Sequence, residues 1–447
     1  MHLTLPRCVP AVLFLFSAAR STLSGLSVLA VPAILAASAV LAASAVLSVP
    51  AVAAEIPAGA VTAKLSEWLQ QHPLTDAACE ELARHELGRS PLTADEAREA
   101  TQLLWASRRE VLRNERRAEM DAREIVLGDL RMPFWYRIFG EAPEDGRSLY
   151  ISMHGGGGAP AAVNDQQYEN QKRLYQPAEG IYLVPRAPTN TWNLWHQQHI
   201  DDFFDRLIVN LVVFENVNPN RVYLMGYSAG GDGVYQLAPR LADRLAAAAM
   251  MAGHPNESRP EGLRNIGFTL HMGANDGAYN RNTVAAEWGR RLKALQEQDP
   301  QGYVHEVTLH EGLGHWMQLR DAVAVPWMAK FQRSPWPGRV VWVQDDVRHS
   351  RFYWLRTNAE QAKPGDEVTA EITDGAVQIR SSSADEVTLL LSDSLVSLDS
   401  AVSVIHPNGM RTEHRVERTA GVLAAALRER SDLPGIYSAV LKLQLQR

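Results

Sequence analysis

The chain has 447 residues, more than one ordinary domain needs and enough for two or three. Hydrophobic residues make up 46% and charged residues 21% of the sequence, which is typical of soluble globular proteins and excludes bulk disorder. The formal net charge of −7 indicates no concentrated basic surface, so we expect no nucleic acid as a partner.

The first 54 residues are predicted to be a signal peptide or membrane anchor. Arg7 precedes a short apolar run at 9–16, and a second run at 23–54 carries no charge. Residues 51–53, Ala-Val-Ala, fit the small-x-small pattern of a signal-peptidase site, so we expect export to the periplasm or outside the cell. About 20 apolar residues can span a bilayer, so an uncleaved anchor is the alternative, and only then is a membrane a partner.

Cysteine usage excludes two kinds of feature. The sequence holds two cysteines, and Cys8 lies in the predicted leader, which leaves Cys79 for the mature chain. A single thiol forms no internal disulfide, and the count excludes a metal site of the cysteine-cluster type.

Residues 55–122 are predicted to form a helical N-terminal segment. Leu65 and Leu69 recur on one face of a helical pattern, with charged residues at the remaining positions. Thr93, followed three residues later by Glu96, resembles a capping box at the start of a further helix.

Between residues 123 and 333 short apolar strands alternate with helical patterns. We expect strands at 149–153, 181–184, 221–225, 246–251, 268–272 and 305–310. We expect helices at 201–215, 231–242, 283–296 and 316–331. This alternation predicts the α/β class, with a mostly parallel sheet, helices on both faces and functional loops beyond the carboxyl ends of the strands.

The helical patterns stop at the Pro-rich joint of residues 335–338. Residues 338–447 contain short strand-like runs separated by turns, which predicts a small C-terminal all-β sandwich. A helical insert is expected at 421–430.

The strongest chemical signal is Gly-Tyr-Ser-Ala-Gly at residues 226–230, which matches Gly-x-Ser-x-Gly. It follows an apolar strand and precedes a helix, the context in which a sharp turn presents the serine hydroxyl above the sheet. An ordinary turn serine would need no such context. We therefore predict Ser228 to be a nucleophile.

A serine hydroxyl needs a base, and the base needs an acid to hold it. In this fold the chain order is serine, acid, histidine. Asp276 follows one predicted strand and His315 follows the last one, so they are the expected acid and base. Asp232 is expected on a helix pointing away, and His310 within a strand.

Acyl transfer also needs donors for the developing oxyanion. Residues 154–158, His-Gly-Gly-Gly-Gly, follow a predicted strand and can wrap tightly with bare backbone N–H groups. We expect the oxyanion hole at Gly155 and Gly156, with the N–H of Ala229 as a further donor. No Gly-Lys-Ser/Thr follows, so a nucleotide site is not expected.

Tryptophan and histidine gather in the predicted loop 189–199 and beside the candidate base. The candidate substrate-binding residues are Trp192, Trp195, His196 and Trp316. They suit the wall or rim of a pocket for an aromatic or sugar-like group, and the alternative is a structural loop held by its tryptophans. A metal site from His196, His199 and Asp201 is conceivable, but a triad needs no metal.

Together these residues resemble the α/β-hydrolase superfamily, within it most nearly the dienelactone hydrolases, the phospholipase/carboxylesterases and the polyhydroxybutyrate-depolymerase-like esterases. The motifs lie at 154–158, 226–231, 273–276 and 312–315, and the resemblance covers 125–333. It implies nucleophile, acid and base roles for Ser228, Asp276 and His315, a reaction without a cofactor, and a small-molecule or polymeric ester as substrate.

Two other functions remain open at this point. One is a serine peptidase of the prolyl-oligopeptidase type, although about 70 helical residues before the hydrolase cannot form the large propeller of such enzymes. The other is an inactive protein whose β-sandwich binds a polymer or a partner, which a complete triad disfavours.

Overall fold

The structure is a computed structural model that describes residues 60–446. The predicted leader and its cleavage site lie outside these residues. By their contacts, the described residues form one compact unit. Within the described range, no helix has the length and hydrophobicity needed to cross a membrane.

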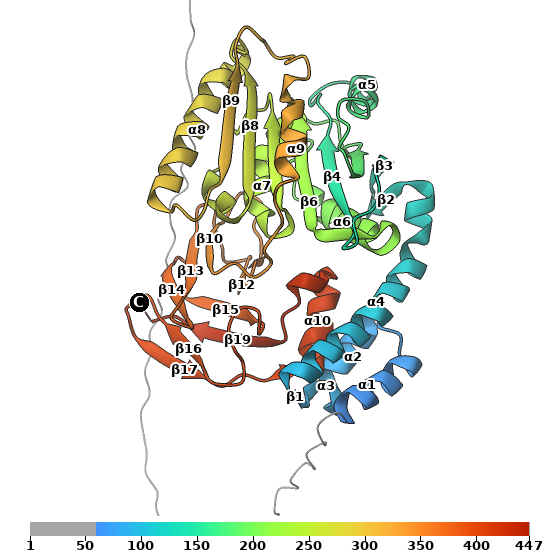
Figure 1. The fold of residues 1–447 in the computed structure, drawn as a ribbon, viewed down its shortest axis with the longest axis vertical. Helices are drawn as coiled ribbons and strands as arrows, with labels where there is room; N and C mark the ends of the chain where they lie inside the picture. The colour runs from blue at the N-terminus through green and yellow to red at the C-terminus, as the bar shows by residue number, and fades with distance from the viewer. Residues whose placement is uncertain (1–59, 447) are drawn as a thin grey trace, which may run out of the picture. The chain divides into compact units, whose positions relative to one another are not determined.

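The N-terminal segment is helical, as its pattern predicts. Its helices are α1 (Ala60–Gln71), α2 (Asp76–Arg84), α3 (Glu86–Arg89) and α4 (Ala94–Ala122). Thr93 caps α4, since its hydroxyl accepts from the Glu96 N–H and the Glu96 carboxylate accepts from the Thr93 N–H. Helices α2 and α4 pack against α10 (Ala420–Arg430) near the other end of the chain (Figure 1). Leu82 and Leu104 share one buried cluster with Leu427.

A central sheet of eight strands organises the middle of the chain (Figure 1). The strands are β2 (Glu124–Leu127), β3 (Leu130–Phe139), β4 (Arg147–Met153), β5 (Gly180–Pro185), β6 (Val217–Tyr227), β7 (Ala247–Met251), β8 (Gly267–Gly273) and β9 (His305–His310). Their order is β2-β3-β5-β4-β6-β7-β8-β9. All pairings from β5 to β9 are parallel, while β2 and β3 are antiparallel.

Helices cover the sheet on both faces, as expected for parallel strands. They are α5 (Ala161–Gln171), α6 (His199–Glu215), α7 (Ala229–Arg240), α8 (Arg281–Gln298) and α9 (Ala324–Met328), with 3-10 turns at η1 (Ala242–Arg244), η2 (Pro260–Asn265), η3 (Ala278–Asn280) and η4 (Arg320–Val323). Every residue of β5, β7 and β8 is buried, which requires cover on both faces and explains why these strands are continuous apolar runs.

The prediction of one long helix at 316–331 is wrong. The chain forms the 3-10 turn η4 and the five-residue helix α9 there instead. Gln318 and Leu319 adopt positive φ angles of 55° and 62°, a left-handed conformation that cannot continue a right-handed helix. The segment after His315 is therefore a loop, and the helix begins only beyond it.

The C-terminal part of the chain forms two small sheets and one helix. One sheet has the order β10-β13-β14-β16-β17 and the other β11-β12-β15-β19. The strands are β10 (Arg339–Val343), β11 (Arg351–Phe352), β12 (Leu355–Arg356), β13 (Glu367–Thr373), β14 (Ala376–Ser382), β15 (Glu386–Leu391), β16 (Val402–Ile405), β17 (Arg411–His414) and β19 (Ala439–Gln444). The two-residue strand β1 (Pro91–Leu92) pairs with β18 (Arg418–Thr419), and η5 (Leu433–Gly435) precedes β19. Helix α10 occupies the position of the expected insert.

Candidate active site

Ser228 lies at a sharp turn between β6 and α7. Its backbone has φ 58° and ψ −120°, a conformation that costs free energy for any residue with a side chain. The Ser228 N–H donates to the carbonyl of Met251 at 2.9 Å, which ties the turn to the neighbouring strand. The strained turn raises the hydroxyl above the carboxyl end of the sheet.

The glycines of the motif are required by close backbone approach. A Cβ on Gly226 would lie 2.2 Å from the Gly230 carbonyl oxygen, and a Cβ on Gly230 would lie 2.2 Å from the Met153 carbonyl oxygen. Both distances are far below van der Waals contact with atoms that cannot move freely. Glycine at these positions lets α7 start directly against β4 and β6.

Two loops bring an imidazole and a carboxylate to the serine. Asp276 follows β8, and His315 follows β9. The Ser228 Oγ lies 2.9 Å from His315 Nε2, and His315 Nδ1 lies 2.6 Å from Asp276 Oδ2. The Asp276 side chain is 2% exposed and that of His315 is 41% exposed. Because the carboxylate accepts from Nδ1–H, Nε2 is left with a lone pair for the serine hydroxyl.

Tyr227 supports the histidine loop, a role that the sequence pattern does not reveal. Its hydroxyl donates to the His315 carbonyl at 2.6 Å and accepts from the Met317 N–H at 3.0 Å. Burial raises the pKa of the Tyr227 phenol, so the hydroxyl keeps its proton. Tyr227, which precedes Ser228 in the chain, thereby fixes the backbone on both sides of Trp316.

The glycine loop after β4 curls against Ser228. A Cβ on Gly155 would lie 3.2 Å from the Ser228 Cβ. Gly156 has φ +112°, and a Cβ there would lie 2.1 Å from Asn164 Oδ1. The N–H of Gly157 donates to that same Asn164 oxygen at 3.0 Å. Gly157 is thus committed to holding the loop, while Gly155 and Gly156 line the cavity at the serine.

His154, the first residue of the loop motif, is structural. It is fully buried, and its Nε2 accepts from the Ala187 N–H at 3.2 Å. Burial lowers the pKa of His154 to about 4, because the charged imidazolium loses its hydration. The ring is neutral at neutral pH and anchors the loop to the end of β5.

A cavity of about 580 Å³ opens at the serine. Besides Ser228, His315 and the two glycines, its lining includes Gln167, Asn170, Leu174, Tyr227 and Trp316. Its volume falls in the range of small-molecule binding sites.

The predicted substrate-binding residues divide into two groups. Trp316 lines the cavity and is 50% exposed, and Trp192 is 62% exposed beside Gly157 and Gly158. Trp195 and His196 are buried and do not line the cavity, contrary to the expectation from the composition of their loop. The Trp195 indole N–H donates to the His154 carbonyl at 2.8 Å, so this tryptophan supports the glycine loop from the core.

The rival acid and base lie elsewhere. Asp232 is on α7, and its Oδ1 accepts from the His254 N–H at 2.6 Å. His310 is the last residue of β9, and its Nε2 lies 3.2 Å from His271 Nδ1. Neither side chain hydrogen-bonds to Ser228 or His315 within the described part of the chain.

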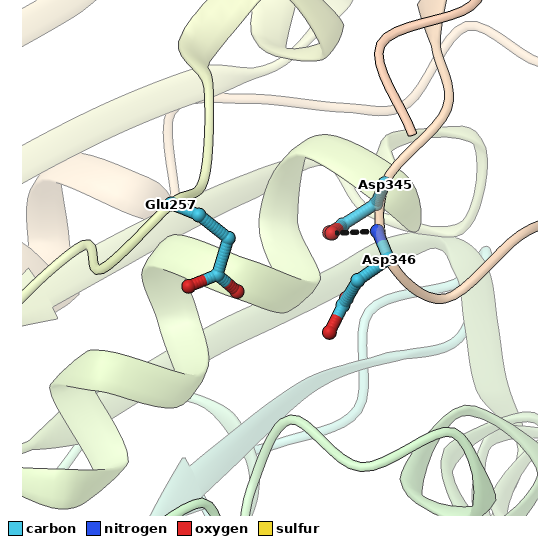
Figure 2. Close-up of side chains that lie close together, drawn as sticks. All are labelled: Glu257, Asp345 and Asp346. Atoms are coloured by element: carbon cyan, nitrogen blue, oxygen red, sulfur yellow. Dashed lines mark hydrogen bonds between the residues drawn. The ribbon is translucent and has the colours of Figure 1, made fainter. Parts of the chain in front are cut away.

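One group of acidic side chains in the described residues is close enough to hold a metal ion. It consists of Glu257, Asp345 and Asp346, and Figure 2 shows Asp345 accepting from the Asp346 N–H. Arg240 Nη1 lies 3.6 Å from Asp345, so an arginine already provides a counter-charge. Asp201, conceivable as a metal ligand from the sequence, instead pairs with Arg240 at 2.7 Å.

A mostly parallel sheet, a serine at a strand-to-helix turn, and acid and histidine loops after two later strands define the α/β-hydrolase fold. The fold class predicted from the sequence, a mostly parallel sheet with helices on both faces, is confirmed.

Comparisons with known proteins find partial structural similarity only. No protein-family model matches the sequence, and no curated protein matches it significantly. Similar solved structures include a thermostable esterase (18% identity, TM-score 0.36), a ferulic acid esterase (12%, 0.33) and an acylaminoacyl peptidase (12%, 0.33). The alignments cover 47%, 46% and 46% of this chain and 62%, 95% and 39% of those chains. Similarities this low do not indicate which substrate the chain acts on.

Proposed function

We propose that the protein is a serine hydrolase that cleaves carboxylic esters through an acyl-enzyme. Ser228 is the nucleophile, His315 the base, and Asp276 the acid that orients it. The supporting observation is the continuous line of contacts at 2.9 Å and 2.6 Å from hydroxyl to imidazole to carboxylate. This arrangement does what nucleophilic catalysis by serine requires.

In the first half of the reaction, Ser228 Oγ attacks the ester carbonyl carbon while His315 Nε2 takes the hydroxyl proton. The negative charge on the tetrahedral intermediate is stabilised by the N–H of Ala229 and by N–H groups of the Gly155–Gly156 turn. One such donor contributes about 3 kcal/mol of transition-state stabilisation. The intermediate collapses, and His315 passes its proton to the departing alcohol.

In the second half, water takes the place of the alcohol. His315 removes a proton from the water as the oxygen attacks the acyl carbon, and Asp276 stabilises the imidazolium formed. Collapse of the second intermediate releases the carboxylic acid and returns the proton to Ser228. The mechanism uses only side chains and backbone of this chain.

We also propose that residues 1–54 direct export of the chain. The small-x-small pattern at 51–53 supports cleavage there. Expression of the full chain in a bacterial host, followed by N-terminal sequencing of the periplasmic protein, tests this. A mature protein that starts near Glu55 is expected, and a full-length chain retained in the cytoplasm would contradict the proposal.

Hydrolysis of p-nitrophenyl butyrate tests the catalytic roles. Ser228→Ala and His315→Ala should each reduce kcat to the background rate while the protein stays folded. His310→Ala is the matched control, because His310 ends β9 just before the loop of His315 but forms no hydrogen bond with Ser228. Full turnover in purified Ser228→Ala, or loss of turnover in His310→Ala with retention in His315→Ala, would contradict the assignment.

A further inference from the structure

The wall of the active-site cavity formed by α5 and the residues after it is polar and carries a positive charge. Gln167 and Asn170 present side-chain amides there, and Arg173 follows the helix. The lining contains three ionisable side chains, those of His315, Tyr227 and Arg173, and no carboxylate. In the described residues the Arg173 guanidinium makes no ion pair, although the chain as a whole is acidic.

Arg173 also lines a second cavity, of about 360 Å³, and is the residue that the two linings share. Arg137 and Lys172 line it as well, and Glu169 is its one carboxylate. Lys172 pairs with Glu169 at 2.6 Å, whereas the Arg137 guanidinium lies over the Phe139 ring at 4.9 Å. Two guanidinium groups of this lining, Arg137 and Arg173, therefore form no ion pair among the described residues.

The arrangement of the site assigns this wall to the acyl side of the substrate. His315 must hand its proton to the departing alcohol, so the alcohol lies on the side of His315 and the adjacent Trp316. The acyl group then extends the other way, past the Gly155–Gly156 turn toward α5. A polar group at the end of the acyl chain can then contact the amides of Gln167 and Asn170 and the guanidinium of Arg173, which line the cavity.

Resting on the proposed ester hydrolysis, we propose that the acyl part of the substrate ends in a carboxylate that Arg173 binds. A guanidinium presents two parallel N–H donors that match the two oxygens of a carboxylate. An uncharged, apolar acyl chain would form no hydrogen bond or ion pair with the amides and the guanidinium along this wall. The substrate class is thus monoesters of dicarboxylic acids, with Arg173 as a specificity-determining residue.

The test compares two esters with the same leaving group and equal size. Mono-p-nitrophenyl adipate carries the terminal carboxylate, and p-nitrophenyl 6-methylheptanoate replaces it with an isopropyl group. The quantity of interest is the ratio of their kcat/KM values, each corrected for hydrolysis without enzyme. Because Arg173 is exposed, its contact with the carboxylate should favour the adipate about fivefold at low ionic strength.

Arg173→Gln should abolish this preference, and mainly through a higher KM for the adipate, because the ion pair forms in ground and transition states alike. Arg173→Lys should keep part of it. Arg290→Gln is the control, since it removes an exposed arginine from α8, which lines neither cavity. Addition of 0.3 M NaCl should shrink the preference of the native protein.

Faster hydrolysis of the neutral ester by the native protein, or an unchanged ratio in Arg173→Gln, would overturn the inference. Hydrolysis of neither ester would instead contradict the proposed function, so the two failures are distinguishable.

Discussion

Replacing Tyr227 by phenylalanine separates positioning of the histidine loop from overall stability. The change removes the hydroxyl that donates to the His315 carbonyl at 2.6 Å and accepts from the Met317 N–H at 3.0 Å. Met317 is fully buried, so its N–H loses its partner without gaining water. A lost hydrogen bond and an unsatisfied buried donor together should lower the free energy of unfolding by about 2–3 kcal/mol.

The same substitution should slow catalysis. With the loop freed, His315 Nε2 no longer stays at 2.9 Å from Ser228 Oγ, and small displacements of reacting groups can cost up to about 100-fold in rate. We expect kcat for p-nitrophenyl butyrate to fall about tenfold with little change in KM.

Urea unfolding and steady-state kinetics on the same preparations provide the assay. Tyr223→Phe is the control, because Tyr223 also lies on β6 and its hydroxyl donates to the Phe331 carbonyl at 2.9 Å, away from the triad. It should lose stability and keep kcat. Equal kinetic effects of the two variants, or a fully active Tyr227→Phe, would refute the positioning argument.

Three further predictions follow from the geometry. Asp276→Asn should lower kcat by about 10⁴-fold with residual activity, because the amide favours the wrong imidazole tautomer; a fully active variant in p-nitrophenyl assays would assign the acid elsewhere. Gly230→Ala, with its Cβ placed 2.2 Å from the Met153 carbonyl, should cost about 3 kcal/mol in urea unfolding, whereas Gly338→Ala, with open space around it, should cost little. Burial lowers the pKa values of His154 and His271 to about 4 in the folded protein. Between about pH 4 and 6.5 the unfolded chain therefore binds more protons at these histidines than the folded protein does. The stability that the two neutral rings contribute above this window is lost as the pH falls through it. Each histidine should therefore contribute about 2 kcal/mol less to the free energy of unfolding at pH 5 than at pH 7. Titration of either ring near pH 6.5 in the folded protein, followed by NMR, would contradict its burial.

The arrangement of Ser228, Asp276 and His315 could be predicted because its requirements are local. The turn at Ser228 needs glycine on both sides, and the loops of Asp276 and His315 follow strands whose apolar runs are plain in the sequence. Each side chain comes to the same edge of the sheet because the carboxyl ends of parallel strands lie together. Local sequence signals therefore sufficed to bring three residues from distant positions together.

The walls of the site could not be predicted in this way. Helix α5 buries only Asn164 and Gln171, so it has no apolar face whose periodicity could reveal it, and the polar wall that it contributes to the cavity was missed. Trp195 was expected in the pocket from its loop, but the loop folds back and its ring is buried. Periodicity reports which elements exist, and it does not report which way a loop turns.

Long-range packing is the other limit. The shared core of Leu82, Leu104 and Leu427 joins segments more than 300 residues apart, and no local pattern indicates such a contact. The helix predicted at 316–331 is longer than the observed helix α9. The left-handed backbone at Gln318 and Leu319, which interrupts it, cannot be recognised from the amino-acid composition of the segment.

Labelling with a fluorophosphonate probe, followed by peptide mass spectrometry, tests most directly whether the serine at the strand-to-helix turn is activated. The native protein should carry one adduct, on the peptide containing Ser228, and His315→Ala should react far more slowly. Absence of an adduct on the folded native protein, or an adduct on another serine that persists in Ser228→Ala, would contradict the account.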